Sequence, residues 1–401
     1  MLRRLLLLAS LALASTASAG PATPSARADP AWDTLFVRTQ GWCGADGAYS
    51  VDLGDGRVLW LFGDTFLGTV VDDRRAAGTI MVNGTVAVHP TPKAGEPPAD
   101  GTLRFYAGPL DADGRATAWI RPEPPVVPPD AKATPTWYWL ADGVVAPGPG
   151  GKPRLLLFLS HMGRRDAAAG VWNFRAVGGA IAIVDDFSGP PDRWRARQVK
   201  NPHTVVLEKP DPVSPEREIS WGAALWREPG DDALYVFGIR EADPFDKQLL
   251  LARAPAATVE DFTTWRFRTK DGWSAERSDA VAVAHGLVNE LSVDRLLVGG
   301  RPRLVLVQSE PVFGKHLLAR TADRPEGPWS DPVPFYEVPG LPEGSKRFTY
   351  AGKAHAECSK PGELLVTYAI NGSEFADILA HASVYRPYFV RVPLDALERV
   401  R

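Results

Sequence analysis

The chain has 401 residues, 45% of them hydrophobic and 23% charged, a composition that allows a large core and excludes a disordered or collagen-like polypeptide. Its 45 basic and 48 acidic residues leave a formal charge of −3, which argues against a basic face for nucleic acid. The 37 glycines and 37 prolines disfavour helix interiors, so the composition predicts many turns. At this length the chain could form two or three domains or one large β domain.

The first 19 residues have the pattern of a secretory signal peptide. Two arginines precede an apolar run over residues 5–14, and Ala17-Ser18-Ala19 matches the small-residue cleavage pattern. The run is shorter than the roughly 20 residues that cross a bilayer, and no later segment is longer, so we expect no membrane span. We predict a secreted or periplasmic protein with a signal peptide over 1–19, a disordered leader over 20–31 and one domain over 32–401.

Five apolar runs of similar form predict the strands of a repeating fold. Each follows a turn that contains Gly or Asp, and successive runs begin 60 to 96 residues apart, which leaves room for a four-stranded antiparallel sheet in every unit. The sequence therefore predicts an all-β fold, a five-bladed β-propeller. A β-sandwich with a second domain explains the fivefold recurrence less well. The runs cover residues 59–63, 155–159, 234–238, 304–308 and 364–368.

A short polar segment lies upstream of each run. In a propeller the innermost strands face the axis, so we expect the polar side chains of these segments to converge on one central funnel. The segments are 45–47, 141–143, 220–222, 289–291 and 354–357.

Two carboxylates, Asp46 and Asp64, are the strongest candidates for chemistry. A hairpin that turns at residues 54–56 would bring both to the same end of a sheet. Two carboxylates suit glycosidic cleavage, because the leaving oxygen needs a proton while the opposite face of the sugar needs an activated water or a nucleophile. Asp46 is the candidate base or nucleophile and Asp64 the candidate acid or pKa-setting partner, or the reverse. Asp64 could instead cap a turn.

Further candidates follow from the same scheme. Glu290 is the third candidate catalytic carboxylate, aimed at the axis or bonded to backbone between blades. Asn83, Trp221 and Arg386 are candidate sugar contacts, each with a turn or packing role as the alternative. Strand alternation would point His355 and Glu357 the same way, where they could bind sugar hydroxyls or a structural cation on the axis.

The chain also contains a single pair of cysteines, Cys43 and Cys358, near the two ends of the mature protein. In an oxidising compartment they could form a disulfide, and otherwise they are two separate buried thiols. The sequence leaves both alternatives open. No cofactor and no metal ligand set is predicted.

Several motifs together resemble the domain of unknown function 4185 family over nearly the whole mature chain. The most specific is Phe62-Gly63-Asp64-Thr65-Phe66 with Asp46 upstream. The others are residues 220–224, 326–330, 350–355 and 385–387.

The resemblance implies a five-bladed propeller and a glycoside hydrolase, since some members of that family are endo-acting D-arabinanases. It also places Asp46 and Asp64 at the two acidic positions that carry catalysis in active members. We therefore predict a secreted hydrolase whose partner is a polysaccharide or oligosaccharide, such as an arabinan. The alternative is a propeller that binds carbohydrate without cleaving it.

Overall fold

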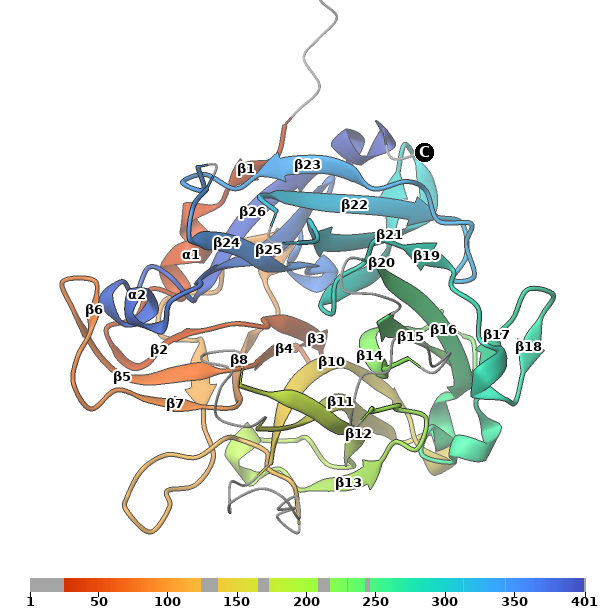
Figure 1. Cartoon of the computed structure of the whole chain (residues 1–401), viewed down its shortest axis with the longest axis horizontal. Helices are drawn as coiled ribbons and strands as arrows, with labels where there is room; N and C mark the ends of the chain where they lie inside the picture. The colour runs from red at the N-terminus through yellow and green to blue at the C-terminus, as the bar shows by residue number, and fades with distance from the viewer. Residues whose placement is uncertain are drawn as a thin grey trace, which may run out of the picture.

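The computed structural model describes residues 25–123, 136–164, 173–207, 217–228, 230–241, 246–312, 314–342 and 344–399. The predicted signal peptide lies outside these residues and stays a prediction. Within them the fold is all-β, as the sequence predicts, with two α-helices of six residues each: α1 (Pro30–Leu35) and α2 (Phe375–Ala380). Figure 1 shows the sheets arranged around a common centre.

Five sheets follow one another along the chain, and all their strand pairs are antiparallel. The first contains β3 (Tyr49–Asp52), β4 (Arg57–Phe62), β8 (Thr85–Pro90) and β9 (Arg104–Tyr106). The second contains β10 (Trp137–Pro147), β11 (Pro153–Gly163), β12 (Arg175–Val184) and β13 (Ala196–Lys200). The third contains β14 (Ile219–Trp226), β15 (Ala233–Glu241), β16 (Lys247–Pro255), β17 (Arg266–Arg268), β18 (Trp273–Ser274) and β19 (Ala284–His285).

The remaining strands complete two such sheets and add a small one. The fourth sheet contains β20 (Leu291–Val298), β21 (Arg301–Ser309), β22 (His316–Ala322) and β23 (Val333–Glu337). The fifth contains β24 (Arg347–Ala354), β25 (Glu363–Gly372), β26 (Pro387–Pro393) and β1 (Arg27–Ala28). The small sheet contains β2 (Gln40–Ala45), β5 (Thr65–Val71), β6 (Arg74–Arg75) and β7 (Ile80–Val82).

Each of the five predicted apolar runs forms the second strand of one of the five sheets: β4, β11, β15, β21 and β25. These strands read as unbroken apolar runs because both of their faces are buried, with alternate residues packing against the sheets on either side. Five apolar clusters result, and one of them joins the fifth sheet to the first. Residues that share a cluster include Leu59 with Leu157, Phe158 with Val236, Phe237 with Leu306, Val307 with Val366, and Leu365 with Trp60.

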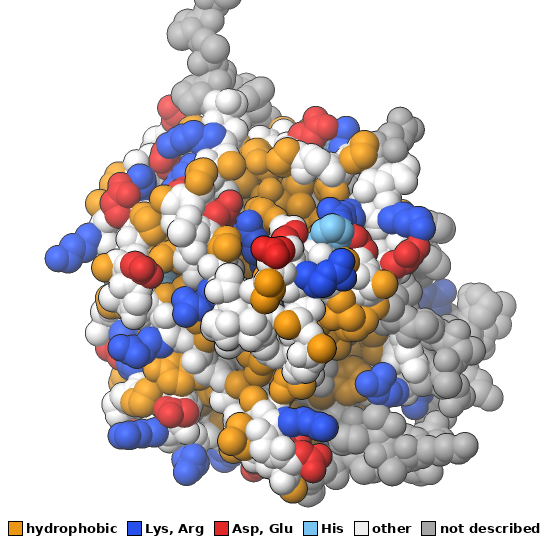
Figure 2. All heavy atoms as spheres, turned by 90° about the vertical axis from the view of Figure 1, so that its left-hand side faces the viewer, with side chains coloured by type: hydrophobic (Ala, Val, Ile, Leu, Met, Phe, Trp, Pro, Cys, Tyr) orange, Lys and Arg blue, Asp and Glu red, His pale blue; other side chains and the backbone are white. Residues whose placement is uncertain are grey.

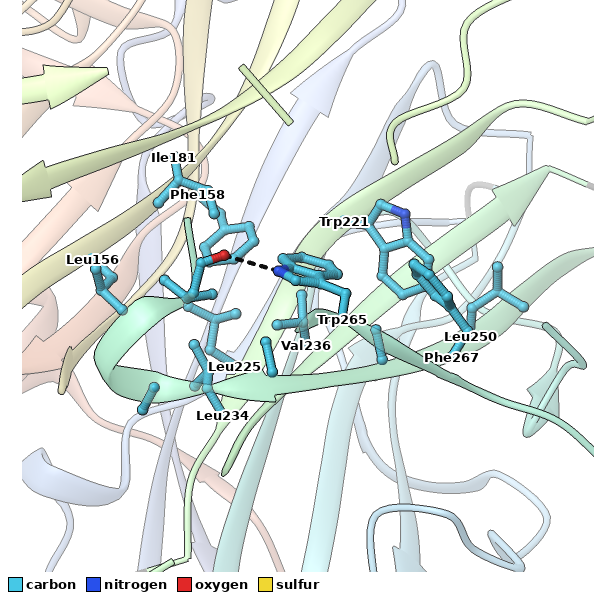
Figure 3. Packing of buried hydrophobic residues seen from close by; sticks show 14 of the residues in the cluster. Leu156, Phe158, Ile181, Trp221, Leu225, Leu234, Val236, Leu250, Trp265 and Phe267 are labelled. Carbon is cyan, nitrogen blue, oxygen red and sulfur yellow. Dashed lines mark hydrogen bonds between the residues drawn. The ribbon is translucent and has the colours of Figure 1, made fainter. Parts of the chain in front are cut away.

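The cluster between the second and third sheets shows how this packing works (Figure 3). Phe158 of β11 lies beside Trp265, whose ring centroid is 6.4 Å away, and Trp265 also contacts Trp221 of β14. The buried Trp265 Nε1 donates to the carbonyl of Val259 at 2.8 Å, so this large ring leaves no unpaired donor in the core.

The two ends of the described chain meet in the fifth sheet. Arg27 pairs with Arg391 and Ala28 with Val390, so β1 adds the outermost strand. Beside it Arg391, whose side chain is buried, donates to Asp29 Oδ2 at 2.7 Å. The leader predicted as disordered over 20–31 is therefore ordered at its C-terminal end, because it supplies backbone partners that the edge of β26 lacks.

The thiols of Cys43 and Cys358 are free, and both are buried. No helix in the described part of the chain is long and apolar enough to cross a membrane. The face in Figure 2 carries charged side chains of both signs interspersed, as expected for a chain of nearly balanced charge.

Candidate active site

A cavity of about 490 Å³ is lined by residues from all five large sheets or the loops between their strands. Near the cavity, β2 of the small sheet and the first strands of the second, third and fifth sheets carry β-bulges, which re-aim side chains and are common beside functional sites. The bulges lie in β2 between Trp42 and Ala45, in β10 between Leu140 and Gly143, in β14 between Trp221 and Ala224, and in β24 between Tyr350 and Lys353.

Two turns bring Asp46 and Asp64 together at this cavity. Asp46 follows β2 and Asp64 lies between β4 and β5, and the backbone N–H of Asp46 donates to the carbonyl of Asp64 at 3.3 Å. The N–H of Gly63 donates back to the carbonyl of Asp46 at 3.1 Å. Gly63 has no space for a side chain, because a Cβ there would collide with Asp46 Oδ1. Both carboxylates line the cavity, as the sequence predicts.

Asp46 is held by two tyrosines from the fifth sheet and the loop before β26. Tyr385 Oη donates to Asp46 Oδ2 at 2.7 Å, and Tyr350 Oη donates to the same oxygen at 2.9 Å. Burial, followed by the negative charges of Asp64 and Glu290, raises the pKa of Asp46 to about 8, although both tyrosine hydrogen bonds oppose the rise. The surroundings of Asp46 therefore favour its protonated form.

Asp64 has different partners. Its Oδ1 accepts hydrogen bonds from Asn83 Nδ2 at 2.8 Å and from Trp139 Nε1 at 2.7 Å. Burial raises the pKa of Asp64 from its ordinary value, while these two donors favour the ionised form and oppose the rise. The donors come from other parts of the fold, which is the geometry of a positioned carboxylate and not of a turn cap.

Glu290, the third carboxylate that the sequence predicts for the site, also lines the cavity. It lies just before β20, and its Oε1 accepts a hydrogen bond from the buried ammonium of Lys353 at 3.1 Å. The Glu290 side chain is 29% exposed and lines the cavity, while the buried Lys353 neutralises it from the protein interior.

Aromatic rings line the cavity on two sides, one beside Asp46 and one beside Asp64; these two carboxylates are called the acid pair below. On the Asp46 side, the Tyr385 ring lies 5.5 Å from Phe66, which lies 6.0 Å from Phe375 at the rim. On the Asp64 side, Trp139 meets Phe174 edge-on at 4.9 Å. Phe375 is 39% exposed, so the aromatic wall beside Asp46 reaches solvent. Sugar rings stack on such faces, which makes the cavity suited to carbohydrate.

A family model for a domain of unknown function, DUF5005, matches residues 29–394. The chain belongs to the DUF5005 family. This corrects the resemblance to the domain of unknown function 4185 family, because the family model that matches the chain is a different one. No curated protein matches the sequence.

Three solved structures are similar to this DUF5005 chain at low sequence identity. A protein from Bacteroides ovatus ATCC 8483, described as a candidate hydrolase, is 18% identical with a TM-score of 0.68, over 92% of this chain and 90% of that one. CoXyl43, a GH43 β-xylosidase/α-arabinofuranosidase from a compost metagenome, is 12% identical with a TM-score of 0.47, over 91% and 94%. The GH62 α-L-arabinofuranosidase domain of Coprinopsis cinerea is 14% identical with a TM-score of 0.44, over 89% and 92%. Of these three, the Bacteroides ovatus protein, with its TM-score of 0.68, shows a shared fold.

The predicted sugar contacts are placed unequally in this DUF5005 domain. Trp221 lines the cavity but is only 5% exposed, and it packs on Phe267 within the core (Figure 3). Asn83 acts through Asp64 and is not among the residues that line the cavity. Arg386 points away, with its guanidinium over the ring of Tyr388 at 3.8 Å.

His355 does not face the cavity either. It is 1% exposed, hydrogen-bonded to Ser50 and Thr367, and lies against the ring of Trp60. The predicted alternation with Glu357 is wrong, because the chain turns into a 3₁₀ helix at Ala356–Cys358 and leaves strand geometry. Within the described residues, no three or more His, Cys, Asp or Glu side chains form a group that could hold a metal ion.

The sequence prediction missed the groups that hold the acid pair: Tyr350, Tyr385 and Lys353. All three lie in motifs that the resemblance singled out, but their roles depend on backbone geometry. The bulge between Tyr350 and Lys353 breaks strand alternation, and Tyr385 has a φ of 71°, a left-handed conformation that the sequence does not signal.

Proposed function

We propose that this DUF5005 protein is a glycoside hydrolase that cleaves O-glycosidic bonds of a polysaccharide, with arabinans and other furanose-containing glycans as the first substrates to test. The observation that carries the proposal is the pair Asp46 and Asp64 at the base of an aromatic-walled cavity, each held by its own set of side-chain donors. Two carboxylates with separate environments are what acid-assisted glycosidic cleavage requires.

The different surroundings of Asp46 and Asp64 favour one assignment of their catalytic roles. Asp46, whose pKa is raised to about 8, is the proton donor to the leaving oxygen. Asp64 is the carboxylate that acts on the anomeric carbon, directly or through a water. Its hydrogen bonds from Asn83 and Trp139 support an ionised carboxylate. This chooses one of the two assignments that the sequence left open.

The architecture that we propose is a five-bladed β-propeller. Five consecutive sheets of at least four strands, five apolar clusters between neighbouring sheets and a last sheet completed by β1 support this count. The small sheet of β2 and β5–β7 is then an addition to the first blade, and it carries Phe66 into the cavity wall.

We also propose that the protein is exported. The predicted signal peptide over residues 1–19 supports this proposal. Peptide mass analysis of the mature protein in the native host tests cleavage after Ala19.

The decisive experiment measures reducing ends released from D-arabinan, L-arabinan, arabinogalactan and xylan by the wild type and by Asp46→Asn and Asp64→Asn. Asp186→Asn is the matched control, because Asp186 lies at the surface away from the cavity. The proposal expects release by the wild type and the control, and binding without release by both site variants. A wild type that binds glycan and releases nothing would instead show a carbohydrate-binding protein.

A further inference from the structure

We propose that Lys353 is a positioning residue, a single buried ammonium that holds the turn of Asp46, the β24 bulge beside Tyr350 and the side chain of Glu290 in their relative places. This inference rests on the proposed function for its catalytic meaning. The contacts that carry it are independent of that function.

The ammonium of Lys353 has three hydrogen-bond donors, and three acceptors surround it. Its Nζ lies 2.6 Å from the carbonyl oxygen of Gly47, 3.1 Å from Glu290 Oε1 and 3.3 Å from the carbonyl oxygen of Ala351. It also lies over the ring of Tyr49, 4.2 Å from the centroid. The side chain is 1% exposed, so water does not compete for these bonds.

Two of these acceptors belong to the segments that position the site, the turn after β2 and the bulge in β24. Gly47 directly follows Asp46, and Ala351 directly follows Tyr350, whose hydroxyl donates to Asp46. Both segments have strained backbone: Ala48 has a φ of 54° and Ala351 a φ of 57°, conformations that residues other than glycine adopt at a cost. A bond from one ammonium to both segments fixes them against each other.

Structural stability alone does not account for a lysine at this position. A buried ion pair loses its hydration, and a well-packed apolar side chain would often stabilise a core equally well. Lys353 is also not among the residues that line the cavity, so it acts through its partners and not on substrate. An apolar residue could not make the hydrogen bonds by which Lys353 connects Gly47, Ala351 and Glu290.

The test compares Lys353→Met with Arg154→Met, a control that also removes a fully buried cation. Arg154 is 2% exposed, pairs with Glu260 and lies outside the cavity lining. We expect Lys353→Met to lower kcat on the cleaved glycan by about 100-fold, the size of loss that a small misplacement causes, with a smaller change in KM. Arg154→Met should lower stability while kcat stays within about twofold of the wild type.

A second readout does not depend on activity. The Asp46 carboxyl is titrated by NMR in protein labelled with ¹³C-aspartate and assigned by the loss of its signal in Asp46→Asn. Removal of the ammonium takes away a nearby positive charge and loosens the tyrosine donors, so the Asp46 titration should move to higher pH in Lys353→Met. It should not move in Arg154→Met.

If Lys353→Met does not fold because Glu290 is left unpaired, Glu290→Gln and the double variant Lys353→Met/Glu290→Gln replace it. In Glu290→Gln, Lys353 still reaches Gly47 and Ala351. The inference expects lower kcat and a higher Asp46 titration in the double variant than in Glu290→Gln. Equal values in the two would overturn it. A wild type inactive on every glycan refutes the proposed function, while the titration still decides the role of Lys353.

Discussion

Removal of the Tyr385 hydroxyl tests most directly whether Asp46 is the proton donor. The hydroxyl donates to Asp46 Oδ2 at 2.7 Å and so stabilises the ionised form of that carboxyl. A hydrogen bond to a charged group contributes about 1.5–3 kcal/mol, and about 1.4 kcal/mol corresponds to one pKa unit. Tyr385→Phe should therefore raise the pKa of Asp46 by about 1–2 units from its value of about 8.

The sign of the effect on activity follows from the role of Asp46. A proton donor works only while it is protonated, so activity falls as pH rises through its pKa. In Tyr385→Phe the alkaline limb of the kcat/KM profile should move to higher pH by about the same 1–2 units. Tyr388→Phe is the control, because the Tyr388 hydroxyl donates to the carbonyl of Ser383 and not to the site. An alkaline limb that stays in place, or moves to lower pH, would refute Asp46 as the proton donor.

Three further predictions concern other parts of the site and fold. Phe375→Ala removes the exposed end of the aromatic wall beside Asp46. It should raise KM for long oligosaccharides about three- to tenfold and leave kcat on short oligosaccharides unchanged. Val281 does not line the cavity, so an equal effect from Val281→Ala would contradict this prediction. Asn83→Ala removes a donor to Asp64 and should move the acidic limb of the pH profile up by about one unit, whereas an unmoved limb would show that Asp64 is not the ionised partner. Burial raises the pKa of Asp142 from 3.8 to about 7, so its contribution to stability is full below pH 3.8 and is lost as pH rises through about 7. Urea unfolding of Asp142→Asn at pH 5 and pH 8 should therefore show a smaller loss of stability with pH than the wild type; an unchanged loss would contradict the raised pKa.

The strands at the centre of the sheets could be predicted well, because a strand that is buried on both faces is apolar at nearly every position, and such a run is recognisable in a short stretch of sequence. Leu157 and Phe158 pack into different clusters on opposite sides of β11, and an apolar run is the only pattern that satisfies both. The proximity of Asp46 and Asp64 was also predictable. Asp64 follows Gly63 at the end of such a strand, and the turn at residues 54–56 joins β3 to β4, so that both carboxylates lie at the same end of this hairpin.

The surroundings of the acid pair were not predictable, because they depend on departures from regular strand geometry. The bulge in β24 places Tyr350 and Lys353 where alternation would not, and the 3₁₀ helix after Ala354 turns Glu357 away from the direction expected from His355. Arg386 was predicted as a sugar contact, yet it lies over Tyr388, and its neighbour Tyr385 makes the hydrogen bond to Asp46.

The central claim is that Asp46 and Asp64 together hydrolyse a glycosidic bond. The most direct measurement is mass spectrometry of products formed from arabinan in H₂¹⁸O. The account predicts ¹⁸O in every new reducing end with the wild type, and no new ends with Asp46→Asn or Asp64→Asn, although both variants still bind the glycan. Glycan that is bound but unchanged by the wild type, or cleaved at the wild-type rate by either variant, would contradict it.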